Sequence, residues 1–229
     1  MVRFAQASAI VLVLALPAAA QTEYPPVPVE KASYHWPVFK NDLVMVLRVI
    51  FLPGRGSNFH IHSTDQLGVV VEAGANANQI YGEAETPPRP AQRGSVGFTA
   101  YSKKQMIHRS TNKGTTPFHN VVISLSKAEP AGFNPEARPE PYKEAFNNER
   151  ARAWKLALDP GQEATAITQK APGLRVVIDG GEIVEIAAGQ PDRGQVLRLG
   201  DFYWQEPGAT RRIKNIGTTR IEIPEFELK

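Results

Sequence analysis

The chain contains no cysteine. This absence excludes disulfide bonds, thiolate metal ligands, a catalytic thiol and a lipid anchor attached through cysteine. Stability must therefore come from an apolar core, and a chain of about 200 residues can bury a sizeable one.

Charge and long apolar segments are also scarce. The formal net charge is only +3, and the lysines and arginines are spread along the chain without a basic run. A nucleic acid is therefore not an expected partner. No segment has the roughly 20 consecutive apolar residues that a membrane helix needs, so stable membrane insertion is not expected either.

The first residues have the layout of a secretory signal peptide. A basic start at Arg3 precedes an apolar run over residues 11–17, and three alanines follow it at 18–20. Cleavage after Ala20 is expected, which predicts an exported protein, in the periplasm or secreted. Residues 21–42 follow as a proline-rich N-terminal arm.

The 19 prolines and 18 glycines indicate many turns and few long helices. Runs rich in apolar and β-branched residues, bounded by turn residues, predict β-strands. They lie at 43–54, 66–74, 119–126, 153–161, 173–181, 195–204 and 218–228. Residues 129–150 carry many prolines and charges and are predicted to form a linker, with room for one short helix.

The sequence repeats itself. "LRVIFLPG" (47–54) aligns with "WKLALDPG" (154–161), and "HRSTNKGTT" (108–116) aligns with "RRIKNIGTT" (211–219). Gly97 and Gly200 also fall in step. Two ordered matches at nearly the same offset predict two copies of one all-β module.

The first copy carries a His-x-His pair in a recognisable frame. Gly54 precedes His60 by the spacing found in the first motif of the cupin superfamily, and His62 follows. Gln66 stands where that family usually has glutamate. The segment Glu72-Ala73-Gly74 has the motif's closing glycine one residue late.

The second cupin motif is also present in part. Gly97, His108 and Asn112 match its spacing, while Lys103 and Gln105 replace its proline and inner glycine. The chain therefore resembles the two-domain cupins, or bicupins. The resemblance implies two tandem double-stranded β-helix (jelly-roll) barrels, at residues 43–128 and 151–229, with a metal site in the first.

The second copy keeps the frame but lacks the ligands. Ile167 and Gln169 occupy the positions of the two histidines, and Arg211 occupies that of the third. An arginine stays protonated and has no lone pair to donate, so the second barrel is predicted to bind no metal. Arg211 either binds an anionic substrate or forms a structural salt bridge.

In the first copy, alternation along a strand places His60 and His62 on one face. If the strand continues, Gln66 joins them and Asp65 faces the other way. His108 completes the set. Three imidazoles suit one divalent transition metal ion, whether Fe, Mn, Ni, Cu or Zn. The neutral Gln66 either binds that ion weakly or orients a histidine by a hydrogen bond.

Other conspicuous residues have structural readings. Asn112 is expected to stabilise a turn, because its counterpart Asn215 persists where the ligands are lost. His119 is expected to be packed or exposed on a strand, and His35 has no visible partner. The aromatic residues Tyr203 and Trp204 are expected in a core or an interface.

Two classes of function remain open. The cupin resemblance implies a metal-dependent enzyme, dioxygenase-like or an isomerase or lyase, that acts on a small organic substrate. No catalytic base can be assigned; Tyr101 is nearest by position, and packing in the barrel wall explains it better. The alternative is a non-catalytic small-molecule-binding or structural bicupin. A homodimer is left open.

Overall fold

β-Strands make up nearly all of the regular structure. The computed structural model describes residues 24–126, 132–208 and 210–229, and within them the one helix is the short 3-10 helix η1 (Val29–Lys31). The fold is all-β, as predicted. The expected signal peptide lies outside the described residues. None of the described residues forms a helix long and apolar enough to cross a bilayer.

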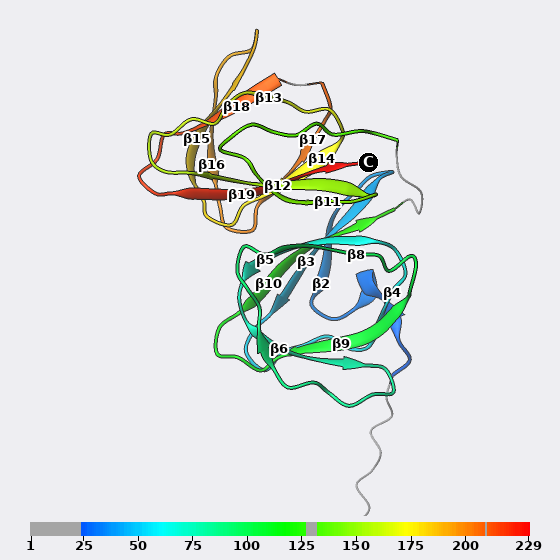
Figure 1. The fold of residues 1–229 in the computed structure, drawn as a ribbon. Coiled ribbons are helices and arrows are strands. Elements are labelled where there is room, and N and C mark those ends of the chain that lie inside the picture. The colour runs from blue at the N-terminus through cyan, green and yellow to red at the C-terminus, as the bar shows by residue number, and fades with distance from the viewer. Residues whose placement is uncertain (1–23, 127–131, 209) are drawn as a thin grey trace, which may run out of the picture.

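The first barrel consists of two five-stranded sheets (Figure 1). One sheet, the facing sheet, lies against the second barrel and has the order β2-β3-β10-β5-β8. Its strands are β2 (His35–Lys40), β3 (Val44–Phe51), β10 (Phe118–Leu125), β5 (Gln66–Glu72) and β8 (Val96–Thr99). The other, the outer sheet, contains β1 (Val27–Pro28), β4 (His60–His62), β9 (Met106–Asn112), β6 (Ala75–Ile80) and β7 (Arg89–Pro90), in that spatial order.

The second barrel repeats this arrangement. Its facing sheet contains β11 (Lys143–Asn147), β12 (Ala151–Leu158), β19 (Ile221–Leu228), β14 (Gly173–Val176) and β17 (Phe202–Gln205), in that spatial order. Its outer sheet contains β13 (Ile167–Thr168), β18 (Thr210–Asn215), β15 (Gly181–Ala187) and β16 (Arg193–Leu197). Strand for strand the order matches the first barrel, apart from β1, which has no counterpart.

Asn112 and Asn215 make the repeat visible at the level of single atoms. The Nδ2 of Asn112 donates to the carbonyls of Phe51 and Thr116, and that of Asn215 donates to those of Leu158 and Thr219. Both side chains are fully buried. The structural role expected for Asn112 is confirmed: it ties a turn to the end of a strand.

Two segments that the sequence analysis placed outside the barrels supply strands to them. Within the expected N-terminal arm, β2 pairs with β3 and β1 pairs with β4. Within the expected linker, Lys143–Asn147 pairs with β12 as strand β11. All three strands lie at sheet edges, where a proline, which lacks a backbone N–H, is tolerated. The prolines in and around these segments therefore did not exclude strands, although they made the segments read as an arm and a linker.

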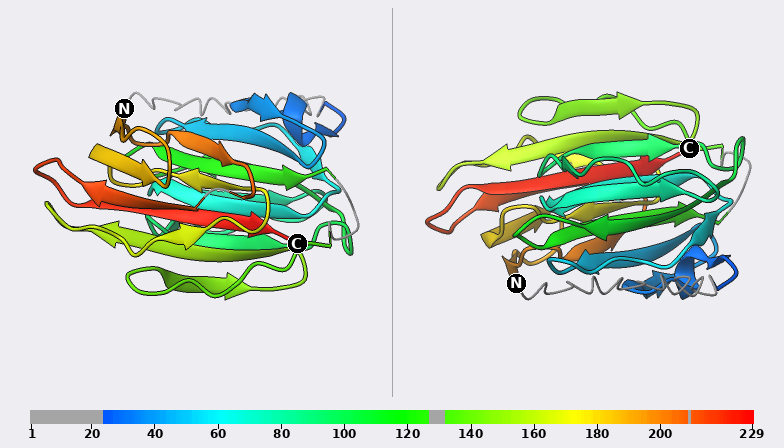
Figure 2. Two further views of the ribbon diagram at one scale, coloured as in Figure 1. Left: turned by 90° about the horizontal axis from the view of Figure 1, so that it is seen from above. Right: turned by 90° about the horizontal axis from the view of Figure 1, so that it is seen from below.

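The two barrels share one apolar core. Val44, Val46 and Ile123 of the first facing sheet pack with Leu174 and Phe226 of the second in one buried cluster. The opposite faces of the same strands fill the barrels, as Leu47 and Phe51 do in the first. Burial on both faces explains why these strands read as nearly continuous apolar runs. Figure 2 shows the strands of the two facing sheets lying along roughly the same axis, with arrows in both directions.

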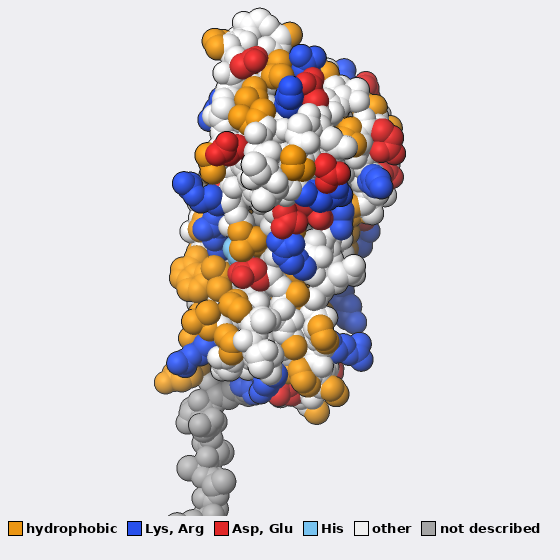
Figure 3. Space-filling view, turned by 90° about the vertical axis from the view of Figure 1, so that its left-hand side faces the viewer, with side chains coloured by type: hydrophobic (Ala, Val, Ile, Leu, Met, Phe, Trp, Pro, Cys, Tyr) orange, Lys and Arg blue, Asp and Glu red, His pale blue; other side chains and the backbone are white. Residues whose placement is uncertain are grey.

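Charged side chains are distributed over the surface. On the face drawn in Figure 3, lysine and arginine alternate with aspartate and glutamate, and apolar side chains gather over the lower, first barrel. This mixture agrees with the small net charge.

Candidate metal centre

Three histidines converge inside the first barrel. His60 and His62 lie two residues apart on β4, and His108 lies directly opposite His60 on β9. One ligand nitrogen from each lies within 4.8 Å of the others. Ligands about 2.1 Å from a common ion lie at most about 4.2 Å apart. A shift of about half an ångström would therefore bring all three nitrogens onto one ion.

A backbone hydrogen bond prepares the His60 ring to act as a ligand. The Nδ1 of His60 donates to the carbonyl of Asn58 at 2.9 Å, which leaves the lone pair on Nε2. The Nε2 atoms of His62 and His108 lie 2.9 Å apart. Two imidazole nitrogens at this distance need either a shared proton or a cation that accepts both lone pairs. The donor set therefore fits a divalent metal ion.

The same environment keeps the rings neutral. Burial, followed by repulsion from His108 and then from the other neighbouring histidines, lowers the pKa of His62 to about 3. Burial and the nearby His60 and His35 lower the pKa of His108 to about 3. Burial also lowers the pKa of His60, against the bond to Asn58. Neutral imidazole is the form that binds a metal.

A fourth histidine belongs to the cluster. The ring of His35 lies 4.6 Å from that of His60 between centroids, and its Nδ1 donates to the carbonyl of Ser33 at 2.9 Å. Burial and repulsion from His60 lower its pKa to about 4. The expectation that His35 has no partner was wrong. Pairing of β2 with β3 brings it into the barrel, and no local spacing in the sequence links it to the His-x-His pair.

Gln66 reaches the site from the opposite sheet. The strand of His60 and His62 ends at His62, and Gln66 begins β5 in the facing sheet. The expectation of one continuous strand was therefore wrong. Gln66 Nε2 donates to Ser124 Oγ at 3.0 Å, and its side chain also interacts with His62, which moderates the lowered pKa of that ring. These contacts place the Gln66 amide beside His62, inside the first barrel.

Asp65 points away from the histidines, as expected, although it lies in the turn before β5 and not on the strand of the histidines. Its carboxylate accepts hydrogen bonds from the backbone and hydroxyl of Ser102 and from Arg150 Nη1 at 3.0 Å. All of its visible partners lie outside the cluster, so Asp65 does not take the place of the missing glutamate.

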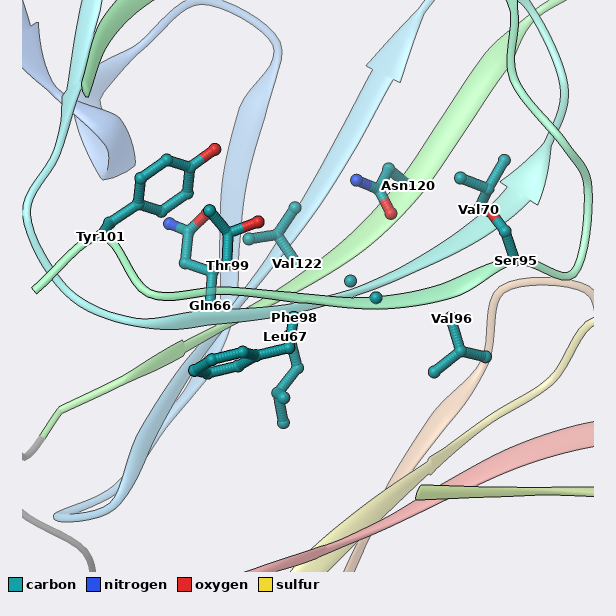
Figure 4. A pocket seen from close by; sticks show the side chains of 12 residues that line it. Gln66, Leu67, Val70, Ser95, Val96, Phe98, Thr99, Tyr101, Asn120 and Val122 are labelled. Carbon is teal, nitrogen blue, oxygen red and sulfur yellow. The ribbon is translucent and has the colours of Figure 1, made fainter. Parts of the chain in front are cut away.

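A pocket of about 290 Å³ adjoins the cluster. Figure 4 shows Gln66, Thr99, Tyr101, Asn120 and Val122 on one side of strands β5 and β8, with Leu67, Val96 and Phe98 on the other side. The first group faces the interior of the first barrel. The walls of the pocket combine apolar side chains with a few polar groups, which is typical of a site for a small molecule.

Two pocket residues can contact a ligand next to the histidines. The ring of Tyr101 stacks on that of His62, with centroids 4.6 Å apart, and burial raises the pKa of Tyr101. The phenol therefore stays protonated and is suited to donate a hydrogen bond rather than remove a proton. Asn120 Oδ1 is buried and has no hydrogen-bond partner within the described chain.

In the second barrel, the positions equivalent to the three histidines hold residues that do not form a metal site. Ile167 joins the apolar core, Gln169 Nε2 donates to the carbonyl of Ala171, and Arg211 forms a 3.1 Å ion pair with Glu225. Arg211 thus forms the expected salt bridge, through its Nη2. No sequence spacing indicated Glu225 as its partner, because the two residues meet only across the closed barrel.

The remaining expectations concern packing. His119 is buried at the contact between the barrels, as expected. Trp204 stacks on Phe39 of the first barrel, with centroids 5.7 Å apart, and so lies in an interface. Tyr203 alternates with it and packs against the core of the second barrel.

Comparison with known proteins finds similar proteins among solved structures only. No family model matches the chain, and no curated protein matches it. Among solved structures, AerE from Microcystis aeruginosa is 11% identical, with a TM-score of 0.60 over 86% of this chain and 98% of AerE. A variant of salicylate 1,2-dioxygenase from Pseudoaminobacter salicylatoxidans, in complex with gentisate, is 12% identical, with a TM-score of 0.59 over 88% of this chain and 76% of that enzyme.

These similarities establish the fold. The chain is a two-barrel protein of the cupin fold, with a histidine triad in the first barrel that can hold a metal ion.

Proposed function

We propose that the protein is a metal-dependent oxidoreductase of the dioxygenase type that acts on a small organic substrate in its first barrel. The observation that carries the proposal is the convergence of three neutral histidines within 4.8 Å, beside a pocket of about 290 Å³.

The donor set suits the chemistry. Three imidazoles bind a first-row divalent ion and leave coordination positions open. Such an ion, when bound, polarises a substrate oxygen atom and, if it is iron or copper, supplies redox chemistry towards O2. The protein contributes neutral ligands, because burial and mutual repulsion hold the histidine pKa values low.

The pocket residues would position the substrate. Gln66, fixed by Ser124, orients His62. Tyr101 donates a hydrogen bond to a substrate oxygen atom, and the unpartnered Oδ1 of Asn120 accepts one from a substrate hydroxyl. Val70 and Val122 supply apolar surface. This combination favours a small, partly apolar molecule with at least one hydroxyl group.

The structural neighbours suggest which substrates to test first. Salicylate 1,2-dioxygenase shares the two-barrel fold, and one of its structures contains gentisate. Hydroxylated aromatic acids are therefore the proposed first substrate class.

We also propose that the protein is exported. The basic start, apolar run and three alanines of residues 1–20 support removal of a signal peptide. Intact mass measured after expression with a functional export pathway should correspond to a chain beginning at Gln21. A chain that retains residues 1–20 and stays in the cytoplasm would contradict this proposal.

Oxygen uptake tests the proposed reaction. The protein is reconstituted anaerobically with Fe(II), and O2 consumption is followed with gentisate, salicylate and related acids. Stoichiometric uptake by the wild-type protein, abolished in His108→Ala and retained in His119→Asn, is the expected result. His119 is a suitable control because it lies outside the cluster, on the other side of the facing sheet. Metal binding without O2 uptake on any of these acids would contradict the proposed activity and favour a binding protein.

A further inference from the structure

The interior of the second barrel is charged where the first barrel has its histidines. Three buried arginines and three glutamates meet there and pair across the barrel. They are Arg138, Arg175, Arg211, Glu185, Glu225 and Glu227. Alternation along β14 and β19 explains the placement of two of them: Leu174 and Phe226 face the first barrel, so Arg175 and Glu225 point inward.

The pairing leaves arginine donors unused. Glu225 Oε2 accepts hydrogen bonds from both Arg211 Nη2 and Arg138 Nη1. Arg138 also pairs with Glu227, and Glu225 Oε1 has no partner among the described residues. Arg211 Nη1 and the Nε and Nη1 atoms of Arg175 are buried and have no acceptor among the described residues. Arg211 is 3% exposed and Arg175 is 4% exposed. Buried charged donors without acceptors are costly.

Both arginines line a pocket of about 230 Å³. The lining includes three arginines and two glutamates, and Glu225, which pairs with Arg211, is not part of it. Of the three arginines, Arg193 is the exposed one. Tyr203 supplies an aromatic surface on which the guanidinium of Arg175 lies, 5.2 Å from the ring centre.

We propose that the second barrel binds a small organic carboxylate between Arg175 and Arg211. A carboxylate accepts several charge-assisted hydrogen bonds in one plane, and it supplies the acceptors that the unused N–H groups of both arginines lack. Tyr203 favours a carboxylate with an apolar or aromatic body. The site lies in the other barrel from the histidine triad, and the proposal does not depend on the proposed oxidoreductase activity.

Calorimetric titration with benzoate tests the proposal, with benzamide as the uncharged isostere. The titrations use His60→Ala/His62→Ala protein in a carboxylate-free buffer, so that no metal in the first barrel can bind the probe. Saturable binding of benzoate with a Kd below about 1 mM, and none of benzamide, is expected. Equal behaviour of the two probes, or no saturation by benzoate, would overturn the proposal.

Variants locate the site. Arg211→Gln and Arg175→Gln should each weaken benzoate binding by about tenfold or more, since each removes charge-assisted hydrogen bonds. The exposed Arg193→Gln should weaken it a few-fold and leave the melting temperature unchanged, so it remains informative if a buried variant fails to fold. Asn120→Ala, in the pocket of the first barrel, should not alter the Kd. Loss of binding in Asn120→Ala with retention in Arg211→Gln would place benzoate in the first barrel and refute the proposal.

Discussion

At the scale of single residues, the charge at position 66 sets the character of the candidate metal site. The cluster contains His35, His60, His62 and His108, and the neutral Gln66 stands where related motifs have glutamate. A divalent ion bound by neutral ligands alone keeps its full double charge in a buried place, which is unfavourable.

Gln66→Glu should therefore strengthen metal binding. A carboxylate on β5, next to His62, removes one unit of net charge from the occupied site and adds an oxygen ligand. We expect affinity for Fe(II), Mn(II) or Zn(II) to rise by about tenfold or more, measured by competition with a chromogenic chelator. The matched Gln66→Met variant has a side chain of similar length but without the carboxylate of Gln66→Glu, and its metal affinity should not rise. An unchanged affinity in Gln66→Glu would mean that position 66 does not reach the ion.

A second prediction at this scale concerns acid stability. Burial alone would raise the pKa of Glu225, but the guanidinium groups of Arg211, Arg138 and Arg175 lower it to about 2. A pKa that is lower in the folded state stabilises the protein above the unfolded value near 4.5, and this contribution is lost as the pH falls towards 2. It amounts to about 3 kcal/mol.

Glu225→Gln removes this contribution. The variant should be less stable than wild type at pH 7, and the difference in unfolding free energy should shrink between pH 4.5 and pH 2, measured by urea denaturation at stepped pH. The contribution of the buried histidines to the free energy of unfolding also decreases as the pH falls. This decrease is the same in the variant and in the wild type, so it cancels in the difference. A difference that stays constant across this range would show that the Glu225 carboxylate has an ordinary pKa.

The sequence predicted the residues of the site only in part, for a physical reason. His60, His62 and His108 follow from motif spacing and from alternation along a strand. His35 and Glu225 do not, because each meets its partners through pairing between strands far apart in the chain. Gln66 was assigned to the right interior but to the wrong strand, since the turn at residues 63–65 transfers the chain from one sheet to the other.

At the scale of the element, Asn112 and Asn215 close the same turn in each barrel. Each side chain donates from its Nδ2 to two backbone carbonyls, and its Oδ1 accepts a hydrogen bond from the backbone N–H of the glycine two residues further on. Asn112→Ala and Asn215→Ala should each lower the free energy of unfolding by about 2 to 4 kcal/mol, because several buried hydrogen bonds are lost at about 1 kcal/mol each. Chemical denaturation measures both.

The two variants should differ in one respect. Asn112 ends the strand that carries His108, whereas Asn215 lies in the other barrel, so Asn215→Ala should retain full metal affinity. A loss of less than about 1 kcal/mol in both variants would contradict the structural role of these asparagines.

The long strands of the facing sheets were predictable as elements. Each seven- or eight-residue strand of β3, β5, β10, β12 and β19 lies in or beside a run rich in apolar residues and is largely buried. Two-residue strands such as β1, β7 and β13 are too short to show any periodicity. Strands β2 and β11 lie in the segments that were expected to be an arm and a linker. Both are edge strands and mostly exposed, so their sequences show no apolar run that would have predicted a strand.

At the scale of the whole molecule, the contact between the barrels depends on close approach at Gly200. A Cβ atom on Gly200 would lie 2.3 Å from Cε1 of His119 in the other barrel, and Gly200 has a φ of +76°. Gly161 has nearly the same φ, +79°, but a Cβ there would meet nothing within 4 Å. The pair separates backbone strain from contact across the interface.

Gly200→Ala should therefore be more damaging than Gly161→Ala. The latter should cost about 1 kcal/mol from its left-handed backbone, and the former about 1 to 3 kcal/mol more, from overpacking. Denaturant titration measures both. Adding His119→Ala should remove the excess in Gly200→Ala but not the cost of Gly161→Ala. Equal losses of unfolding free energy in Gly200→Ala and Gly161→Ala would mean that His119 and its neighbours can shift to accommodate the added methyl group.

The sequence predicted two barrels but not how they pack. The repeat and the apolar runs establish two similar modules, yet both faces of β3 and β10 are apolar, so nothing in their pattern tells the barrel interior from the interface. The choice depends on the complete shape of both sheets.

Metal content tests the central claim of this account most directly. Wild-type protein expressed from Gln21 onwards is reconstituted with each candidate divalent ion and then desalted. Its bound metal is measured beside that of His60→Ala/His62→Ala and of the control His119→Asn. The account predicts about one ion per chain in the wild type and in His119→Asn, and none in the double variant. No bound ion in the wild type, or an ion that persists in the double variant, would contradict it.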